Sequence, residues 1–171
     1  MKVYRSEKQG QIIRQMNIKI RKVEMSDSEA IRDISTEGLG YSCDLVLVQN
    51  KIAGLNNDRE AVFVAVIDGK ENEAAGSKGA IGSVIGYIHV ERYDVLYFES
   101  MANILGLSVF KAYHKMGIGK ALLFAAEAWA KENGIKMMRL NSGSNRTDAH
   151  GFYQHLGYVS EKEQKRFMKT L

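Results

Sequence analysis

The order of hydrophobic and polar positions predicts strands and helices that alternate along the chain. Residues 17–23, NIKIRKV, alternate polar and apolar side chains, which is typical of a strand with one buried face. A helix is expected over residues 27–37, because Ser26 and Glu29 have the spacing of a capping box and glycines follow the end of this stretch. Residues 44–55 predict a shorter helix, although their valines leave a strand as the alternative.

Two apolar runs further along predict a pair of neighbouring strands. Residues 61–69, AVFVAVIDG, have the composition of a buried strand that ends in an Asp-Gly turn, and residues 81–95 supply its partner. Between them, residues 69–80 are polar and rich in glycine, which predicts a loop rather than a linker between domains. The chain contains no proline, hence no proline-rich linker. We therefore expect a single domain over residues 17–171, preceded by a poorly structured N-terminal extension, residues 1–16.

The most regular part of the chain joins a strand, a glycine turn and a helix. Residues 103–110, NILGLSVF, predict a strand in which Gly106 marks a bulge or the close approach of another backbone or a ligand. From Ile118 the apolar residues follow the spacing of an amphipathic helix, which Asn133 and Gly134 end. The turn before this helix contains two glycines, so its backbone N–H groups and the positive end of the helix dipole can hold a phosphate.

Two common phosphate motifs do not fit this turn, whose glycines are Gly117 and Gly119. A Walker loop requires a glycine where the chain has His114, and a serine or threonine where it has Ala121. A dinucleotide fingerprint requires a third glycine where the chain has Leu122. The turn therefore belongs to another class of phosphate site.

The C-terminal part of the chain predicts a strand, a short helix and a last strand. Residues 136–143, KMMRLNSG, have the pattern of a strand. Residues 146–158 predict a short helix with one apolar face, which Gly157 ends. Residues 163–171, EQKRFMKTL, are expected to form the last strand.

Composition and charge narrow the function classes. Hydrophobic residues make up 45% and charged residues 26% of the 171 residues, which are ordinary globular values, and no apolar run is long enough to span a bilayer. The formal net charge is +4 and the lysines and arginines are spread along the chain, so nucleic acid is not favoured as a partner. The single cysteine, Cys43, and the polar start of the chain favour the reducing cytoplasm. Because the histidines and this cysteine lack the paired spacing of a zinc site, we expect no metal.

From about residue 17 onward the sequence resembles the GNAT superfamily of N-acetyltransferases, which use acetyl-coenzyme A. The family's signature is Gln or Arg, two residues, Gly, one residue, and Gly or Ala, preceded by a strand with Leu-x-Val. Leu107, Val109, Gly117 and Gly119 match it, and His114 stands in place of Gln or Arg. The resemblance implies a single domain of the α/β (α+β) class, in which a central mixed, mostly antiparallel sheet splays at the strand with Leu107 and Val109 and is flanked by helices.

The closing pattern of the family aligns with the short helix near the C-terminus. Its Asn falls on Arg146, with Asn145 one residue earlier. By resemblance Tyr153 is the general acid that protonates the departing thiolate, whereas periodicity alone indicates a core aromatic at this position. The residues that the resemblance assigns to coenzyme A binding are Leu107, Ser108, Val109, His114, Lys115, Met116, Gly117, Ile118, Gly119, Lys120, Asn145, Ala149 and Phe152.

Acetyl transfer requires a site that aligns a primary amine with the thioester, polarises the thioester carbonyl and moves protons. By resemblance, backbone groups near Leu107 and Val109 align the pantetheine arm as an extra strand, and an N–H there polarises the carbonyl. The family often carries a carboxylate four to six residues before the valine, where this chain has residues 103–105, Asn-Ile-Leu.

The sequence therefore does not identify the general base. Glu99 is the nearest acid upstream and is our candidate, Glu91 on the preceding strand is another, and a water relay to a backbone group or a remote carboxylate is a third route. His89 and His155 are interpreted as structural, because neither has an acid, serine or cysteine partner at the spacing of a catalytic triad.

The reaction expected from the resemblance is transfer of an acetyl group from acetyl-coenzyme A to a primary amine of a small substrate, by direct attack in a ternary complex. The alternatives are a catalytically silent domain that binds coenzyme A for regulation, and an enzyme that acetylates a macromolecule, such as a protein N-terminus or a charged tRNA. We expect no membrane partner. The acceptor amine and the oligomeric state, a homodimer included, are left open.

Overall fold

The computed structural model describes residues 17–68 and 82–171. The predicted N-terminal extension, residues 1–16, and the predicted loop, residues 69–80, lie outside the described residues. The chain divides into two compact units, Met1–Leu140 and Asn141–Leu171. The sheet and the helices that cover it belong to the first unit.

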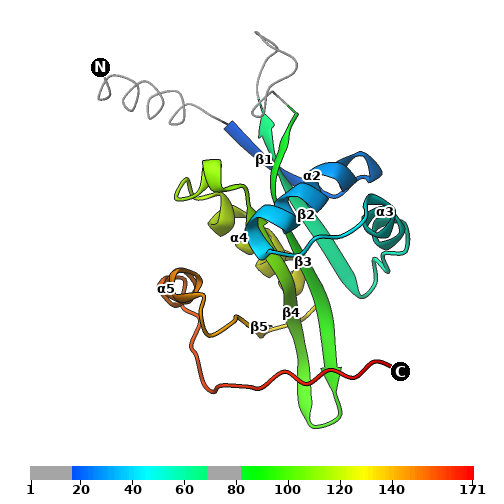
Figure 1. The fold of residues 1–171 in the computed structure, drawn as a ribbon. Helices are drawn as coiled ribbons and strands as arrows, with labels where there is room; N and C mark the ends of the chain where they lie inside the picture. The colour runs from blue at the N-terminus through cyan, green and yellow to red at the C-terminus, as the bar shows by residue number, and fades with distance from the viewer. Residues whose placement is uncertain (1–16, 69–81) are drawn as a thin grey trace. The chain divides into compact units, whose positions relative to one another are not determined.

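The described part of the first unit is built on a five-stranded sheet with the strand order β1-β2-β3-β4-β5 (Figure 1). The first four strands pair antiparallel in sequence order, and β5 pairs parallel to β4. This is the mixed, mostly antiparallel sheet that the sequence predicts. The strands are β1 (Asn17–Lys22), β2 (Glu60–Asp68), β3 (Val84–Val95), β4 (Phe98–Val109) and β5 (Met138–Leu140).

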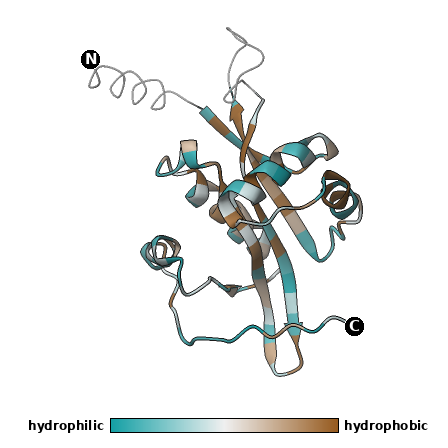
Figure 2. Cartoon of the chain, viewed as in Figure 1, coloured by the Kyte–Doolittle hydropathy of each residue, from teal (hydrophilic) through white to brown (hydrophobic). Residues whose placement is uncertain are grey.

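Helices cover both faces of this sheet. Tyr87 belongs to the hydrophobic cluster that contains Ile31 and Ile34 of α2, whereas a Cβ on its neighbour Gly86 would lie 3.2 Å from Leu122 of α4. Since successive residues of a strand point to opposite faces, α2 and α4 lie on opposite sides of the sheet (Figure 1). Hydrophobic residues line the strands where they cross between these layers (Figure 2). The helices of the first unit are α2 (Ser28–Ile34), α3 (Leu45–Ala53) and α4 (Ile118–Glu132).

The start of α2 differs from the prediction in its cap. The predicted capping box of Ser26 and Glu29 is wrong, because the box forms between Glu24 and Asp27 around a 3-10 turn that precedes the helix. Asp27 is buried and accepts two hydrogen bonds from the guanidinium of Arg21, at 2.7 and 2.8 Å. An ion pair with β1 thus selects the cap, which local spacing alone does not reveal.

The remaining helices of the first unit are where the pattern predicts them. The segment after α2 continues as a π-helical turn, Ser35–Leu39, and ends at Gly40 with a left-handed φ of 78°. Residues 44–55 form the helix α3 rather than the alternative strand, and α4 ends at Asn133 as predicted.

The second unit contains the helix α5, Thr147–His155, followed by Gly157 with a left-handed φ of 89°. The helix and its glycine end are confirmed. The last strand expected over residues 163–171 is wrong, since no strand is found in this part of the described chain. The reason is compositional: the stretch is highly charged, and its apolar side chains Phe167 and Met168 are 88% and 78% exposed instead of alternating into a core.

Candidate functional site

One edge of β4 is left without a neighbouring strand over the segment that the sequence singles out. β5 pairs with β4 only over the range Ala102–Ile104. Beyond this point, residues 105–109 have no strand partner on that side within the described ranges. The sheet therefore opens at the strand segment with Leu107 and Val109, as predicted.

A β-bulge lies where this opening begins. His89 of β3 pairs with Gly106, and the next residue, Val90, pairs with Ile104, so that Leu105 is an extra residue on β4. The bulge predicted at Gly106 is confirmed one residue earlier. Bulges increase the local twist of a strand, and this one lies directly after the residues of β4 that pair with β5.

The backbone groups of Leu107 and Val109 point toward the open edge. Phe110 donates its N–H to the carbonyl of Ile85 in β3, at 2.9 Å. In an antiparallel pair such bonded residues alternate with residues whose N–H and C=O point the other way, which are here Leu107 and Val109. The Val109 carbonyl accepts a hydrogen bond from Nε2 of His114 at 2.9 Å, which agrees with this orientation.

The turn before α4 presents free backbone donors beside that edge. Gly117 is the N-cap of α4, with a left-handed φ of 81° and no side-chain cap. The first helical hydrogen bond runs from the N–H of Ala121 to the carbonyl of Gly117, at 3.0 Å. The N–H groups of residues 118–120 therefore lack partners within the helix, at the positive end of its dipole. Lys115 has a φ of 62°, a conformation that costs a non-glycine residue about 1 kcal/mol and tends to occur at ligand sites.

The first unit thus brings together most of the residues that the sequence assigns to the donor. Ser108 is buried and hydrogen-bonds the Ile34 carbonyl of α2, so it braces β4. His114 contacts the strand through Val109 rather than turning its ring into the glycine turn. The side chains of Lys115 and Lys120 are exposed.

The second unit carries the predicted general acid. Tyr153 of α5 is half-buried and its ring packs against Phe152 and Tyr158, with centroids 5.2 and 5.7 Å apart. Burial raises the pKa of the Tyr153 phenol, while the charge of Arg146 acts in the opposite direction. The phenol is therefore protonated at neutral pH, as a proton donor must be. Asn145 is exposed before this helix, and Ala149 lies within it, half-buried.

The two acids considered as bases lie in different settings. Glu99 is exposed near the start of β4, eight residues before Leu107, which is roughly 25 Å along a strand. Glu91 of β3 pairs with Asn103 of β4, and the Asn103 amide donates a hydrogen bond to the Glu91 carboxylate at 2.9 Å. The side-chain oxygen of Asn103, Oδ1, is buried and has no hydrogen-bond partner in the described part of the chain.

A hydrogen-bonded pair of His89 and Glu60 is the feature that the sequence does not reveal. Nε2 of His89 lies 2.8 Å from Oε2 of Glu60, and both side chains are about one quarter exposed. Burial acts to raise the pKa of Glu60, but hydrogen bonds from Asn56 and His89 and the charge of Lys51 lower it overall. The two residues are 29 positions apart, and only the pairing of β2 with β3 brings them together. His89 therefore has the acid partner that local spacing did not show.

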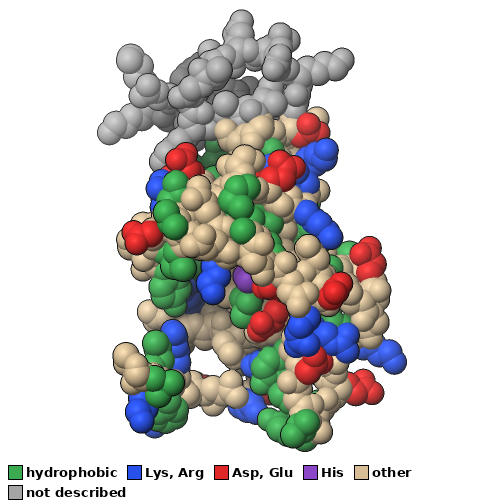
Figure 3. Space-filling view, turned by 90° about the vertical axis from the view of Figure 1, so that its right-hand side faces the viewer, with side chains coloured by type: hydrophobic (Ala, Val, Ile, Leu, Met, Phe, Trp, Pro, Cys, Tyr) green, Lys and Arg blue, Asp and Glu red, His purple; other side chains and the backbone are tan. Residues whose placement is uncertain are grey.

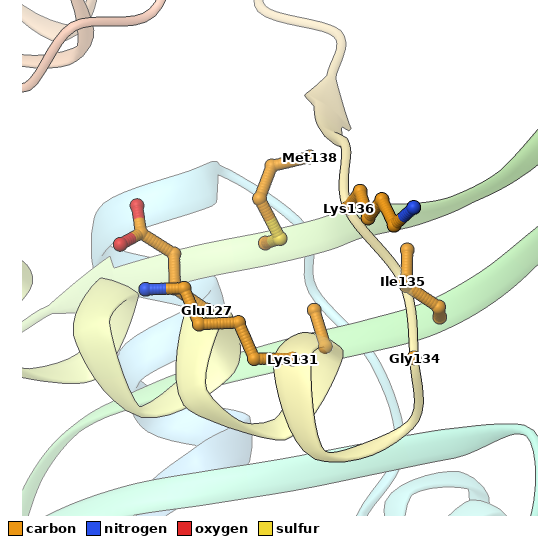
Figure 4. A pocket seen from close by; sticks show the side chains of 7 residues that line it. Glu127, Lys131, Gly134, Ile135, Lys136 and Met138 are labelled. Atoms are coloured by element: carbon orange, nitrogen blue, oxygen red, sulfur yellow. The ribbon is translucent and has the colours of Figure 1, made fainter.

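A separate pocket of about 450 Å³ lies between the C-terminal part of α4 and the segment that leads into β5 (Figure 4). Glu127 and Lys131 of α4 line it, with Met138 of β5. None of the predicted site residues lies in it.

Other classes of site find little support in the described residues. Over 17–68 and 82–171, no group of three or more histidine, cysteine, aspartate or glutamate side chains could hold a metal ion. Within the same ranges no helix is both long and apolar enough to cross a membrane. Acidic and basic side chains are intermixed on the face seen in Figure 3, instead of forming the continuous basic surface that favours nucleic acid.

Comparison with known proteins agrees with this geometry. A family model described as the acetyltransferase (GNAT) family matches residues 28–158. An uncharacterized N-acetyltransferase of Chlorobaculum tepidum is 28% identical over 148 residues, which are 84% of this chain and 77% of that protein. A candidate acetyltransferase of Bacillus subtilis is 38% identical over 58 residues, 34% of this chain and 37% of that protein. The chain thus spans less than half the length of the first curated relatives it matches.

A solved structure shows the same fold. It is that of the aminoglycoside N-acetyltransferase AAC(6')-Iy in complex with coenzyme A, with a TM-score of 0.73 over 91% of this chain and 97% of that one. The sequence identity is 18%, so the likeness concerns the fold.

Proposed function

Because the chain belongs to the acetyltransferase (GNAT) family, we propose that it moves an acetyl group from acetyl-coenzyme A to a primary amine of a small acceptor. Donor and acceptor are bound together, and the amine attacks the thioester directly. The observation that carries the proposal is the open edge of β4 over residues 105–109, which lies directly before the free N-terminus of α4.

This arrangement fits the two chemically different parts of the donor. The pantetheine arm carries amide groups, which can pair with the outward backbone groups of Leu107 and Val109 as a strand would. The diphosphate carries negative charge, which suits the free N–H groups of residues 118–120 and the positive end of the α4 dipole. The exposed Lys115 and Lys120 add positive charge near the same turn.

The reacting groups have defined roles in this proposal. A backbone N–H at the open edge of β4 polarises the thioester carbonyl, so that negative charge can develop on its oxygen. The amine nitrogen forms a bond to the carbonyl carbon, and the bond from carbon to sulfur breaks with its electron pair on sulfur. Tyr153, whose phenol is protonated at neutral pH, gives its proton to the departing thiolate.

A thiol-release assay with purified protein tests the proposal. The acceptor panel contains a polyamine, an aminoglycoside, amino acids and a peptide with a free N-terminus, and acetyl-coenzyme A without acceptor is the control. We expect thiol release that depends on one acceptor class, with acetylated product detected by mass spectrometry. Tight binding of acetyl-coenzyme A with no acceptor-dependent release would favour the silent regulatory domain, and release only with proteins or charged tRNA would favour the macromolecular alternative.

A further inference from the structure

The structure places a polar pair, His89 and Glu60, on the α2 face of the sheet at the level where the sheet opens. His89 is the β3 residue that pairs with Gly106, one position before Leu107. It shares its face with Tyr87, which hydrogen-bonds Ser35 of the π-helical turn. The pair therefore faces the side of the sheet covered by α2.

Glu60 sets the protonation pattern of the His89 ring. One carboxylate oxygen of Glu60 accepts the N–H of Asn56 at 3.0 Å, and the other lies 2.8 Å from Nε2 of His89. An ionised carboxylate only accepts hydrogen bonds, so Nε2 must carry the proton in this contact. Nδ1 of the neutral ring then has a free lone pair, and no described residue forms a hydrogen bond to it.

Gly106, the β4 residue between this ring and the open edge, carries no side chain of its own. A Cβ at Gly106 would lie 3.7 Å from Leu39 Cδ1 and 3.8 Å from Tyr87 Oη, in ordinary contact with both. The space above Gly106 is therefore small, and it is lined by the Tyr87 hydroxyl as well as by a methyl group. A group the size of a methyl fits at this position, and so does a single water molecule, with the Tyr87 hydroxyl as one polar neighbour.

We propose that His89, oriented by Glu60, is the general base of the acetyl transfer and receives the acceptor's proton through one water above Gly106. This inference rests on the proposed function. An imidazole suits the role, since one ring nitrogen can accept a proton while the other donates its N–H to the carboxylate that orients the ring.

The protons balance as follows. The acceptor enters as an ammonium with three protons on nitrogen and leaves as an amide with one. His89 Nδ1 takes the first proton before the attack and later releases it to solvent. The second proton leaves nitrogen after the new bond forms, and it replaces the proton that Tyr153 has given to the thiolate sulfur.

Variant kinetics across pH test this role. His89→Gln keeps a polar side chain of similar size but cannot accept the proton, and kcat/KM at neutral pH should fall about 10²-fold to 10³-fold. Affinity for acetyl-coenzyme A should not change, which also shows that the variant folds. As the pH rises toward the pKa of the acceptor amine, the variant should approach the wild-type rate, because the amine then arrives without its extra proton.

Variants of other charged and titratable groups around His89 can be compared with His89→Gln. These groups are Glu60 on β2, Glu91 and Tyr87 on β3, and Lys51 of α3, whose charge acts on Glu60. Glu60→Gln should reduce kcat/KM by about tenfold, since it weakens the hydrogen bond that orients the His89 ring but leaves His89 in place. His155→Gln, at the exposed end of α5, is the matched control and should behave as the wild type.

Three results would overturn the inference. These are a wild-type rate in His89→Gln, a loss of rate that is the same at every pH, and a loss in Glu91→Gln that His89→Gln does not share. If His89→Gln fails to fold, the pH profile of Glu60→Gln decides in its place, with an unchanged profile counting against the inference. Failure of the wild-type protein to acetylate any amine would instead refute the proposed function.

Discussion

Gly38 of the π-helical turn packs against β4, and the substitution Gly38→Ala tests how this packing affects the stability of the protein. A Cβ at this position would overlap the Ser108 hydroxyl, whereas the next nearest atoms, Ser108 Cβ and the Val109 carbonyl oxygen, lie at 3.4 and 3.8 Å. The hydroxyl is buried and donates to the Ile34 carbonyl at 3.3 Å. Gly38→Ala should therefore displace the hydroxyl and break this bond.

The cost can be worked out from these contacts. Loss of the buried hydrogen bond contributes about 1 kcal/mol, and overpacking adds at least about 1 kcal/mol, so Gly38→Ala should reduce the free energy of unfolding by about 2 kcal/mol. Ser108→Ala alone should cost about 1 kcal/mol. In the Ser108→Ala background the clash is gone, and Gly38→Ala should then cost close to nothing.

Urea denaturation of the two single variants and the double variant, followed by circular dichroism, measures this coupling. We expect the double variant to be more stable, by about 2 kcal/mol, than the sum of the two single effects implies. Additive effects would mean that a side chain at position 38 does not contact β4 at Ser108.

Three further predictions concern the donor and the acid. Gly119→Val should abolish acetyl-coenzyme A binding in calorimetry while the protein stays folded, because the branched side chain occupies space needed by the diphosphate; unchanged affinity would count against the assignment. A hundredfold excess of acetyl-coenzyme A over Kd should stabilise the native protein by about 2.7 kcal/mol in thermal denaturation, and an equal shift with NAD or ATP would indicate a different ligand. Tyr153→Phe should retain donor affinity and lose about 10²-fold to 10³-fold in kcat in the thiol-release assay, and full activity would remove the phenol from the mechanism.

The strand, turn and helix that we propose to bind the donor could be predicted from sequence, because they follow one another in the chain. Gly106, Leu107, Gly117 and Gly119 lie within fourteen residues, and the order of strand, turn and helix fixes how their backbone groups are arranged. The same holds for α4, whose apolar spacing is regular over its full length.

What the sequence did not reveal depends on interactions that the pattern of a single element does not show. The α2 cap depends on the ion pair from Arg21 of β1, and the His89 pair depends on the register of β2 against β3. The register has no local signal, since it is set by the whole hydrophobic face of a strand. The cap is local, but the spacing of Ser26 and Glu29 gives no sign that Arg21 binds the Asp27 carboxylate. The last strand was expected from a short stretch whose charges oppose burial.

Hydrogen–deuterium exchange with and without acetyl-coenzyme A shows whether the donor binds at the open edge of β4 and the start of α4. The proposed site uses the backbone N–H groups at the open edge of β4 and at the start of α4, so their exchange reports on donor contact. We expect slower exchange in peptides that cover residues 105–110 and 115–121 when the donor is bound. Donor binding with slower exchange elsewhere, for example around the pocket between α4 and β5, and none in these two segments would contradict it.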